Sequence, residues 1–274
     1  MAFLLSIVKP PPSWGHADLI ALIDTVSKQI ETEPKNAALH LRRGQLYRFH
    51  LDWALAERDY DRAVQLDPKL NAVYLDRGKM LFESGQNDRA KIDLDKYLTG
   101  QADDVDALMT RARILMKLGQ HHAAIADFNR AINHAPEPMA DYFLERARAQ
   151  AEGGDNDAAL RGLDQGLKRL GPSITLLVYA IELDVAAKHF DNALSRLETI
   201  SSRVERKEKW LAQRGEILVL ASRRDEAQKS FHEALTAIEL LPPRLRQTPA
   251  MLDLKKRVDH ALVSLTIDLN NAKK

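Results

Sequence analysis

Apolar positions along the chain recur in short blocks, and each block contains an arginine followed by glycine or alanine. The blocks are LHLRRGQLY, VYLDRGKML, ALMTRARIL, YFLERARAQ and WLAQRGEIL. Their arginines are separated by 34, 34, 35 and 68 residues, and they are Arg43, Arg77, Arg111, Arg146 and Arg214. A step near 34 residues, with one member absent from the last gap, predicts a helical repeat.

Helix-ending residues fall between the apolar stretches. Pro68 and Pro136 each disfavour helical conformation in the residue before them. Proline also lacks the backbone N–H donor that would continue a helix. Gly85, Gly119 and the pair Gly153-Gly154 stand where short turns would join two helices. The pattern therefore predicts pairs of helices whose apolar faces are completed by stacking on neighbouring pairs.

Small and aromatic residues within each step resemble those of the tetratricopeptide repeat family, whose unit is a pair of helices. In the first repeat the small residues are Gly44 and Ala56, and Tyr47, Tyr60 and Ala63 surround them before Pro68. The third repeat matches with Ala112, Leu115, Ala124, Phe128, Ala131 and Pro136, and the sixth with Gly215, Leu218, Ala227, Phe231 and Ala234. The fifth departs most, because Ile181 stands where glycine or alanine is expected.

The resemblance implies an all-α chain, a right-handed superhelical solenoid of about six helix pairs with a leading helix and a C-terminal capping helix. We expect the leading helix over 18–35 and the repeats over 36–241. The repeat limits that we predict are 37–70, 71–104, 105–139, 140–173, 174–207 and 208–241. The capping helix is expected over 242–274, where Thr248-Pro249 is a typical helix start.

The first seventeen residues have two interpretations. Residues 2–8 form an apolar run without a basic flank before it, and Gly15-His16-Ala17 resembles the small-residue pattern before a signal-peptidase site. Residues 1–17 are thus either a signal-peptide remnant or a flexible tail. We favour export to the periplasm slightly over a cytoplasmic location, and the sequence has no apolar run long enough to be a transmembrane segment.

Composition narrows the classes of function. Forty basic and thirty-nine acidic residues give a formal net charge of +1, which argues against nucleic-acid binding through gross positive charge. The chain contains no cysteine, so disulfides, thiolate metal sites and cysteine nucleophiles are excluded.

Catalytic and cofactor motifs are absent from the sequence. The chain has no HExxH and no GxSxG, and Gly153-Gly154 is not followed by a phosphate-loop lysine. The adjacent pair His121-His122 cannot chelate one ion from a helix, and Asp103, Asp104 and Asp106 lack the glycine and glutamate of a calcium loop. We therefore predict a protein that is not an enzyme and that needs no metal or other cofactor.

The repeated arginines have a structural interpretation. Sixteen residues after Arg43, Arg77 and Arg111 stand Asp59, Asp93 and Asp127. This spacing predicts a bidentate arginine–carboxylate pair between the two helices of one repeat. Gly162 and Ser230 occupy the matching positions after Arg146 and Arg214, which we expect to be less constrained.

The resemblance also implies a concave face, lined by the first helix of each repeat, on which partners bind. The residues that we expect in this groove are Leu41, Gln45, Phe49, Leu75, Lys79, Phe82, Met109, Arg113, Met116, Leu144, Arg148, Glu182 and Glu216. Lys79, Arg113 and Arg148 would form a basic ladder that attracts an acidic segment. The alternative is a solvated face with local pairs, such as Lys79 with Glu83.

These observations predict a non-catalytic scaffold that binds a protein or peptide partner, with an acidic segment the candidate partner. Repeats of this family that grip the acidic tails of heat-shock chaperones carry lysine and asparagine where this chain has Leu41 and Gln45, so that partner is disfavoured. The alternatives are an oligomer-forming structural subunit, with self-association through the convex or end faces, or an accessory subunit of an enzyme complex.

Overall fold

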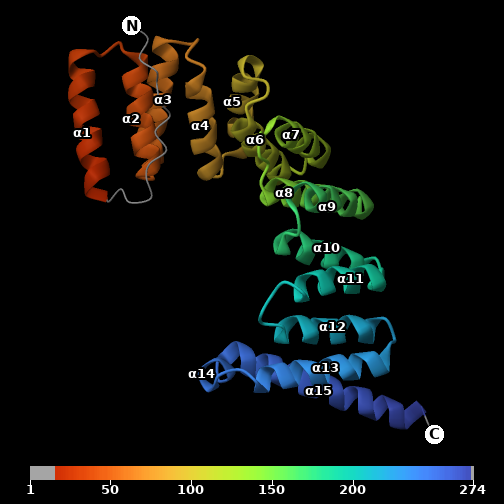
Figure 1. Cartoon of the computed structure of the whole chain (residues 1–274). Helices are drawn as coiled ribbons and strands as arrows, with labels where there is room; N and C mark the ends of the chain where they lie inside the picture. The colour runs from red at the N-terminus through yellow and green to blue at the C-terminus, as the bar shows by residue number, and fades with distance from the viewer. Residues whose placement is uncertain (1–15, 273–274) are drawn as a thin grey trace. The chain divides into compact units, whose positions relative to one another are not determined.

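A computed structural model describes residues 16–272, and every regular element within that range is a helix. Figure 1 shows these helices in successive pairs. Their bounds are α1 His16–Thr32, α2 Ala37–Phe49, α3 Trp53–Leu66, α4 Ala72–Glu83, α5 Asn87–Gly100, α6 Val105–Lys117, α7 His121–His134, α8 Ala140–Glu152, α9 Asn156–Leu170, α10 Ile174–Ala186, α11 Phe190–Ser201, α12 Glu208–Leu220, α13 Arg224–Glu239, α14 Pro243–Arg246 and α15 Pro249–Ala272. The all-α prediction is confirmed for the described residues.

The predicted tail or signal-peptide remnant over 1–17 lies almost wholly outside the described residues. The leading helix α1 already begins at His16, two residues before the predicted start. At the other end α15 begins at Pro249, directly after Thr248, and the short helix α14 precedes it. None of the described helices is long and apolar enough to cross a membrane. The six repeat limits remain a prediction.

Two compact units divide the chain, one up to Pro136 and the other from Glu137 onward. The first contains α1–α7 and the second contains α8–α15. The division falls in the loop between α7 and α8, where the Ala135-Pro136 helix stop was predicted. Within the units, the helices pack as the pairs α2–α3, α4–α5 and α6–α7, and as α8–α9, α10–α11 and α12–α13.

Each of these six pairs contains one residue in the left-handed backbone region at the turn between its helices. Three of them are glycines, Gly85, Gly119 and Gly154, with φ between 70° and 90°. The other three are Leu51, Lys188 and Ser222, with φ between 61° and 66°. The turn geometry is therefore common to all six pairs, although only half of them place glycine where positive φ is least costly.

Close approach of two helices explains the small residues within three pairs. A Cβ atom added to Gly44 would lie 2.7 Å from the Tyr60 ring, and one added to Gly215 would lie 2.5 Å from the Phe231 ring. At Gly78 the nearest atom would be a methyl carbon of Leu94, at 2.9 Å. The predicted small positions thus allow a buried side chain of the second helix to pack against the backbone of the first.

Both ends of the chain are packed onto the repeats next to them. Helix α1 buries Leu19, Ile23 and Val26 against Leu46 of α2. Helix α15 buries Leu254, Val258 and Leu265 in a cluster with residues of α12 and α13. The terminal helices therefore cover apolar surface that the adjacent helix pair would otherwise expose.

Candidate binding surfaces

Three arginines of the first compact unit join the helices of each pair through bidentate contacts. Arg77 on α4 donates from Nε and Nη2 to the two carboxylate oxygens of Asp93 on α5, at 2.7 and 2.8 Å. Arg43 binds Asp59 in the same way at 2.6 and 2.8 Å, and Arg111 binds Asp127 at 2.7 Å for both contacts. The predicted arginine–carboxylate pairs are confirmed.

The same arginines also reach the second helix of the preceding pair, which the sequence analysis missed. Arg77 donates from Nη1 to Asp61 on α3 at 2.6 Å, and Arg111 donates to Asp95 on α5 at 2.8 Å. Arg43 makes the corresponding contact with Ser27 on α1, at 3.1 Å. The signal was present, because each of these acceptors lies sixteen residues before its arginine. We call these three contact sets, centred on Arg43, Arg77 and Arg111, the arginine clasps.

Electrostatics keep the clasps charged. The hydrogen bond with Asp93 raises the pKa of Arg77, and burial opposes that effect only in part. The hydrogen bonds with Asp59 and Asp127 likewise raise the pKa of Arg43 and Arg111. Guanidinium groups are cationic at all ordinary pH values, so these ion pairs persist. Each clasp holds the two helices that flank a first helix at a fixed distance from it.

The second compact unit uses a different arrangement at its middle pair. The position that holds arginine in the clasps is Ala180, and the position of the aspartate is Arg196 on α11. Arg196 donates from Nε to Asp184 on α10 at 2.7 Å and from Nη1 to Asp164 on α9 at 2.6 Å. The cation has moved from the first helix to the second, yet it still connects three successive helices.

The two repeated arginines of the second unit, Arg146 and Arg214, differ from the clasps. Arg146 is buried and donates to the carbonyl oxygen of Gly162 and to the side chain of Gln165. Burial lowers the pKa of Arg146. Arg214 is half-buried, and its Nη1 lies 3.8 Å from a carboxylate oxygen of Glu233. The prediction of less constraint therefore holds for Arg214, whereas Arg146 is enclosed.

The first helices of the first unit present a row of polar side chains that are paired from one helix to the next. We call this surface of α2, α4 and α6 the first-helix face. Gln45 donates to Asp76 at 2.7 Å, and Arg48 binds both carboxylate oxygens of Glu83 at 2.6 and 2.8 Å. Lys79 forms an ion pair with Asp106 on α6.

The local pair expected between Lys79 and Glu83 is wrong. Both residues lie on α4, but Glu83 is bound by Arg48 of α2, and Lys79 is bound to Asp106 of α6. Contacts between neighbouring helices replace the contact within one helix, because stacking brings opposite charges from adjacent first helices into hydrogen-bonding range. The pairs neutralise much of the charge of the row.

A buried carboxyl lies at the centre of the first-helix face. Asp76 is 9% exposed, and burial raises its pKa although Gln45 and Arg48 oppose the change. Behind it, the Tyr60 hydroxyl forms no hydrogen bond within the described residues, and burial raises the pKa of that phenol.

Most of the predicted apolar groove residues belong to the core. Leu41, Leu75, Met109 and Leu144 are buried, with exposed fractions between 2% and 7%. Phe49, Phe82 and Met116 are half-buried, and Phe49 packs against the cluster formed by α1 and α2. The fifth position of these four repeats thus leaves little side chain for a partner.

The predicted basic ladder is divided between the two compact units. Lys79 and Arg113 belong to the first unit, and both are half-buried. Arg148 belongs to the second, where it is exposed and lies over the ring of Tyr179 at 5.8 Å. Glu182 is exposed, and Glu216 accepts a hydrogen bond from Arg257 of α15 at 3.0 Å. Whether these residues contact a partner stays a prediction.

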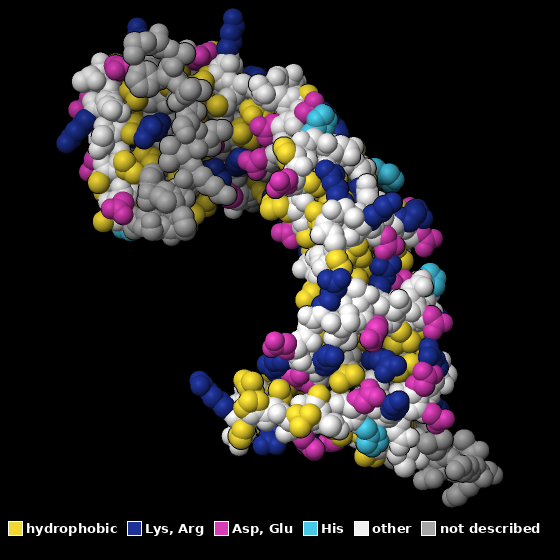
Figure 2. All heavy atoms as spheres, viewed as in Figure 1, with side chains coloured by type: hydrophobic (Ala, Val, Ile, Leu, Met, Phe, Trp, Pro, Cys, Tyr) yellow, Lys and Arg dark blue, Asp and Glu magenta, His cyan; other side chains and the backbone are white. Residues whose placement is uncertain are grey.

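Charges of both signs are interspersed over the surface of the second unit, and Figure 2 shows them alternating on the visible face. Apolar side chains gather at the end of that unit near α14 (Figure 2). Leu240, Leu245 and Leu252 are exposed in this region, and Leu240 reaches 81%.

Metal-ligating residues do not cluster within the described part of the chain, where no group of three or more could hold an ion. His122 and His134 are exposed, whereas His121 is half-buried. His40 is buried, which the sequence did not indicate, and its Nδ1 lies 3.1 Å from Asp59.

Comparison with known proteins places these features in a family. The family model described as tetratricopeptide repeat matches residues 31–107 and 109–173, which together make up more than half of the chain. No curated protein matches the sequence.

Solved structures with the same fold are similar in structure rather than in sequence. The C-terminal part of a TPR repeat-containing protein from Cytophaga hutchinsonii has 14% identity and a TM-score of 0.67, covering 86% of this chain and 94% of that one. A tetratricopeptide repeat protein from Parabacteroides merdae has 18% identity and a TM-score of 0.56, covering 88% and 93%. YrrB, described as a TPR protein with an unusual peptide-binding site, has 14% identity and a TM-score of 0.51, covering 65% and 91%.

The helix pairs, the 34-residue step and the family match agree, and this fold is typical of proteins that bind other proteins. The chain belongs to the tetratricopeptide repeat family.

Proposed function

We propose that this protein is a non-catalytic scaffold that binds a peptide or an extended segment of a protein partner on its first-helix face. The observation that carries the proposal is the row of ordered polar side chains on α2, α4 and α6. Gln45, Arg48 and Lys79 are each held by a carboxylate of the next first helix. A partner would therefore meet donors and acceptors that are already in place, which lowers the entropic cost of binding.

The chemistry of the partner follows from the side chains of this row. Arginine and lysine alternate with carboxylates, while Phe82 and Met116 are half-buried beside them. A segment with acidic residues and apolar side chains would exchange internal ion pairs for pairs across the interface. The peptide site named for YrrB belongs to a protein of the same fold and is compatible with this proposal.

Selected peptides provide the test. Peptides would be chosen by display on the purified full chain, and their affinities measured by fluorescence anisotropy at two salt concentrations. We expect enrichment of Asp and Glu, and binding to K79E/R113E that is weaker by about tenfold, since charge-assisted contacts are lost.

The matched control is K28E/K229E, which makes the same change of charge at two exposed lysines of α1 and α13. Its affinity should equal that of the unaltered protein. Unchanged affinity and unchanged salt dependence in K79E/R113E would reject the first-helix face as the binding surface.

Self-association is the second candidate, and the exposed leucines near α14 favour it. Leu240, Leu245 and Leu252 lie where α13 ends and α15 begins, and such a cluster is typical of a contact surface. Light scattering over a wide range of concentration tests it, with L240E/L252E as the disrupting variant. A monomer at every concentration would contradict this candidate and leave the peptide proposal unaffected.

A further inference from the structure

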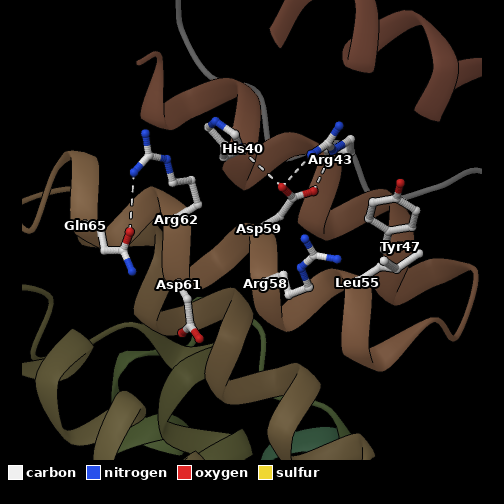
Figure 3. A pocket seen from close by; sticks show the side chains of 9 residues that line it. All are labelled: His40, Arg43, Tyr47, Leu55, Arg58, Asp59, Asp61, Arg62 and Gln65. Atoms are coloured by element: carbon white, nitrogen blue, oxygen red, sulfur yellow. Dashed lines mark hydrogen bonds and ion pairs between the residues drawn. The ribbon is translucent and has the colours of Figure 1, made fainter. Parts of the chain in front are cut away.

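A second surface, on the opposite side of the helix pair from the polar row, contains a pocket of about 550 Å³ between α2 and α3. Figure 3 shows His40 and Arg43 above Asp59, with Arg58 below them. Tyr47 and Leu55 lie on one side of Arg58, and Arg62 and Gln65 lie on the other. The lining is therefore basic at its centre and apolar at one end.

The acidic groups of this pocket are already satisfied. Asp59 accepts two hydrogen bonds from Arg43, and His40 Nδ1 lies 3.1 Å from one of its oxygens. The other ring nitrogen of His40 lies 3.3 Å from the carbonyl oxygen of Pro34. Asp61 is bound by Arg77 of α4 at 2.6 Å. Asp59 is therefore matched by Arg43, whereas Asp61 shares the charge of Arg77 with Asp93 and keeps part of its negative charge.

Two cations of the pocket have no carboxylate partner within the described residues. Arg58 and Arg62 are exposed and lie one turn apart on α3. Arg58 forms no hydrogen bond or ion pair in the part of the chain that the structure describes, and Arg62 reaches only the amide oxygen of Gln65, at 3.4 Å. Their guanidinium groups are therefore available for a carboxylate, which arginine binds in a bidentate geometry.

The apolar end of the pocket indicates what kind of anion fits. Tyr47 is half-buried and Leu55 is 39% exposed, so a side chain next to the bound carboxylate would contact an aromatic ring and a leucine. A small inorganic anion would leave that end unused. A peptide that places an apolar residue beside an acidic one would use both ends.

The corresponding region of the second unit lacks these features. A smaller pocket of about 230 Å³ there is lined by Leu167, Leu177 and Arg196 among others. Its arginine is held by Asp164 and Asp184. The arginine of this second pocket is thus not available to a ligand, in contrast to Arg58 and Arg62.

We propose that the pocket between α2 and α3 binds an acidic–apolar peptide segment of a protein partner through Arg58 and Arg62. This site is separate from the first-helix face, so one chain would contact partners on two sides. Inorganic phosphate is also an oxyanion that guanidinium groups bind, so it is one arm of the test.

The experiment uses the full chain and two short fluorescein-labelled peptides. In one peptide Glu alternates with Phe and Leu, and in the other Gln replaces every Glu. We expect the Glu peptide to bind the unaltered protein, and R58E/R62E to weaken that binding by about tenfold or more. The neutral variant R58Q/R62Q should give a smaller loss, and circular dichroism establishes that each variant is folded.

The matched control is R161E/K168E on α9. Arg161 occupies the same repeat position as Arg58, and both residues of the control are exposed. The control should bind the Glu peptide as the unaltered protein does. Because the first-helix face is proposed to take a peptide of similar chemistry, R58E/R62E is also combined with K79E/R113E, and the loss caused by R58E/R62E should remain about tenfold in that background.

Three results would overturn the proposal. The first is equal affinity of R58E/R62E and the unaltered protein for the Glu peptide. The second is equal binding of the Glu and Gln peptides, or no binding of either. The third is binding of inorganic phosphate without binding of the Glu peptide, which would make the pocket a small-anion site.

Discussion

In each compact unit a cation connects the second helix of one pair to both helices of the next pair. The helix that carries this cation differs between the two units. In the first unit Arg77 extends from a first helix to Asp93 and Asp61 on the two flanking second helices. In the second unit Arg196 extends from a second helix to Asp184 and Asp164. Because the carboxylate of the preceding pair occupies the same repeat position in both cases, the packing position is kept while the residue that supplies the charge changes.

This difference shows that a buried carboxylate at this depth can be paired with an arginine from either helix of the pair. Asp93 is 5% exposed and Asp184 is 1% exposed, so neither carboxylate can rely on water. A buried carboxylate without a partner is costly, and either arrangement avoids that cost.

The largest effect is expected from removing the cation in either unit. R77A and R196A should each lower the free energy of unfolding by about 3 kcal/mol, since each leaves a buried carboxylate, Asp93 or Asp184, without its cationic partner. Urea unfolding followed by circular dichroism measures this change. R89A, which removes an exposed partner of Glu57, is the control and should cost less than about 0.5 kcal/mol. A small effect in R196A alone would mean that the two arrangements are not equivalent.

Smaller effects, of opposite sign in the two units, are expected from substitutions at the turns between paired helices. Gly85 and Lys188 occupy the same repeat position with φ of 82° and 61°. G85A should destabilise the protein by about 1 kcal/mol, because a Cβ atom is unfavourable at positive φ. K188G should stabilise it by about 0.5 kcal/mol, since relief of strain exceeds the added chain entropy. Thermal unfolding of both variants checks the signs, and destabilisation by K188G would contradict this account.

The carboxyl at the centre of the first-helix face should make the stability of the first unit depend on pH. Burial raises the pKa of Asp76, so the folded protein binds this proton more tightly than the unfolded chain. Its contribution to stability is present below the unfolded pKa and is lost as pH rises through the folded pKa. Relative to D76N, the unaltered protein should therefore lose stability as the pH rises from the usual aspartate pKa, about 4, through the raised pKa of the folded state. Urea midpoints at several pH values test this, and a gain with rising pH would show that Gln45 and Arg48 outweigh burial.

The smallest effect is expected at the loosely held arginine of the second unit. Arg214 lies 3.8 Å from Glu233, and both side chains are more than one-third exposed. R214A should change the free energy of unfolding by less than about 0.5 kcal/mol, as exposed ion pairs usually do. A cost close to that of R77A would show that this residue is part of a clasp.

Sequence patterns predicted part of each unit and missed the rest for identifiable reasons. The forward spacing from Arg77 to Asp93 lies within one helix pair, so it could be predicted from the length of two helices and a turn. The backward contact with Asp61 depends on how one pair stacks on the next, which the spacing within a single pair does not determine. The partner of Lys79 was assigned within one helix, whereas stacking brings Asp106 closer.

The sequence alone determined the repeat, the helical class and the small positions, because a 34-residue step with glycine or alanine opposite large side chains has few other solutions. Gly44 against Tyr60 and Gly215 against Phe231 follow from that pattern. Only the tertiary structure decided which charged side chains pair between helices and which remain accessible. Arg196 and Arg58 are both arginines on second helices, but Arg196 is bound to two carboxylates, whereas Arg58 is bound to none within the described residues. The physical reason is that ion pairing depends on distances between neighbouring helices, which no spacing along a single helix determines.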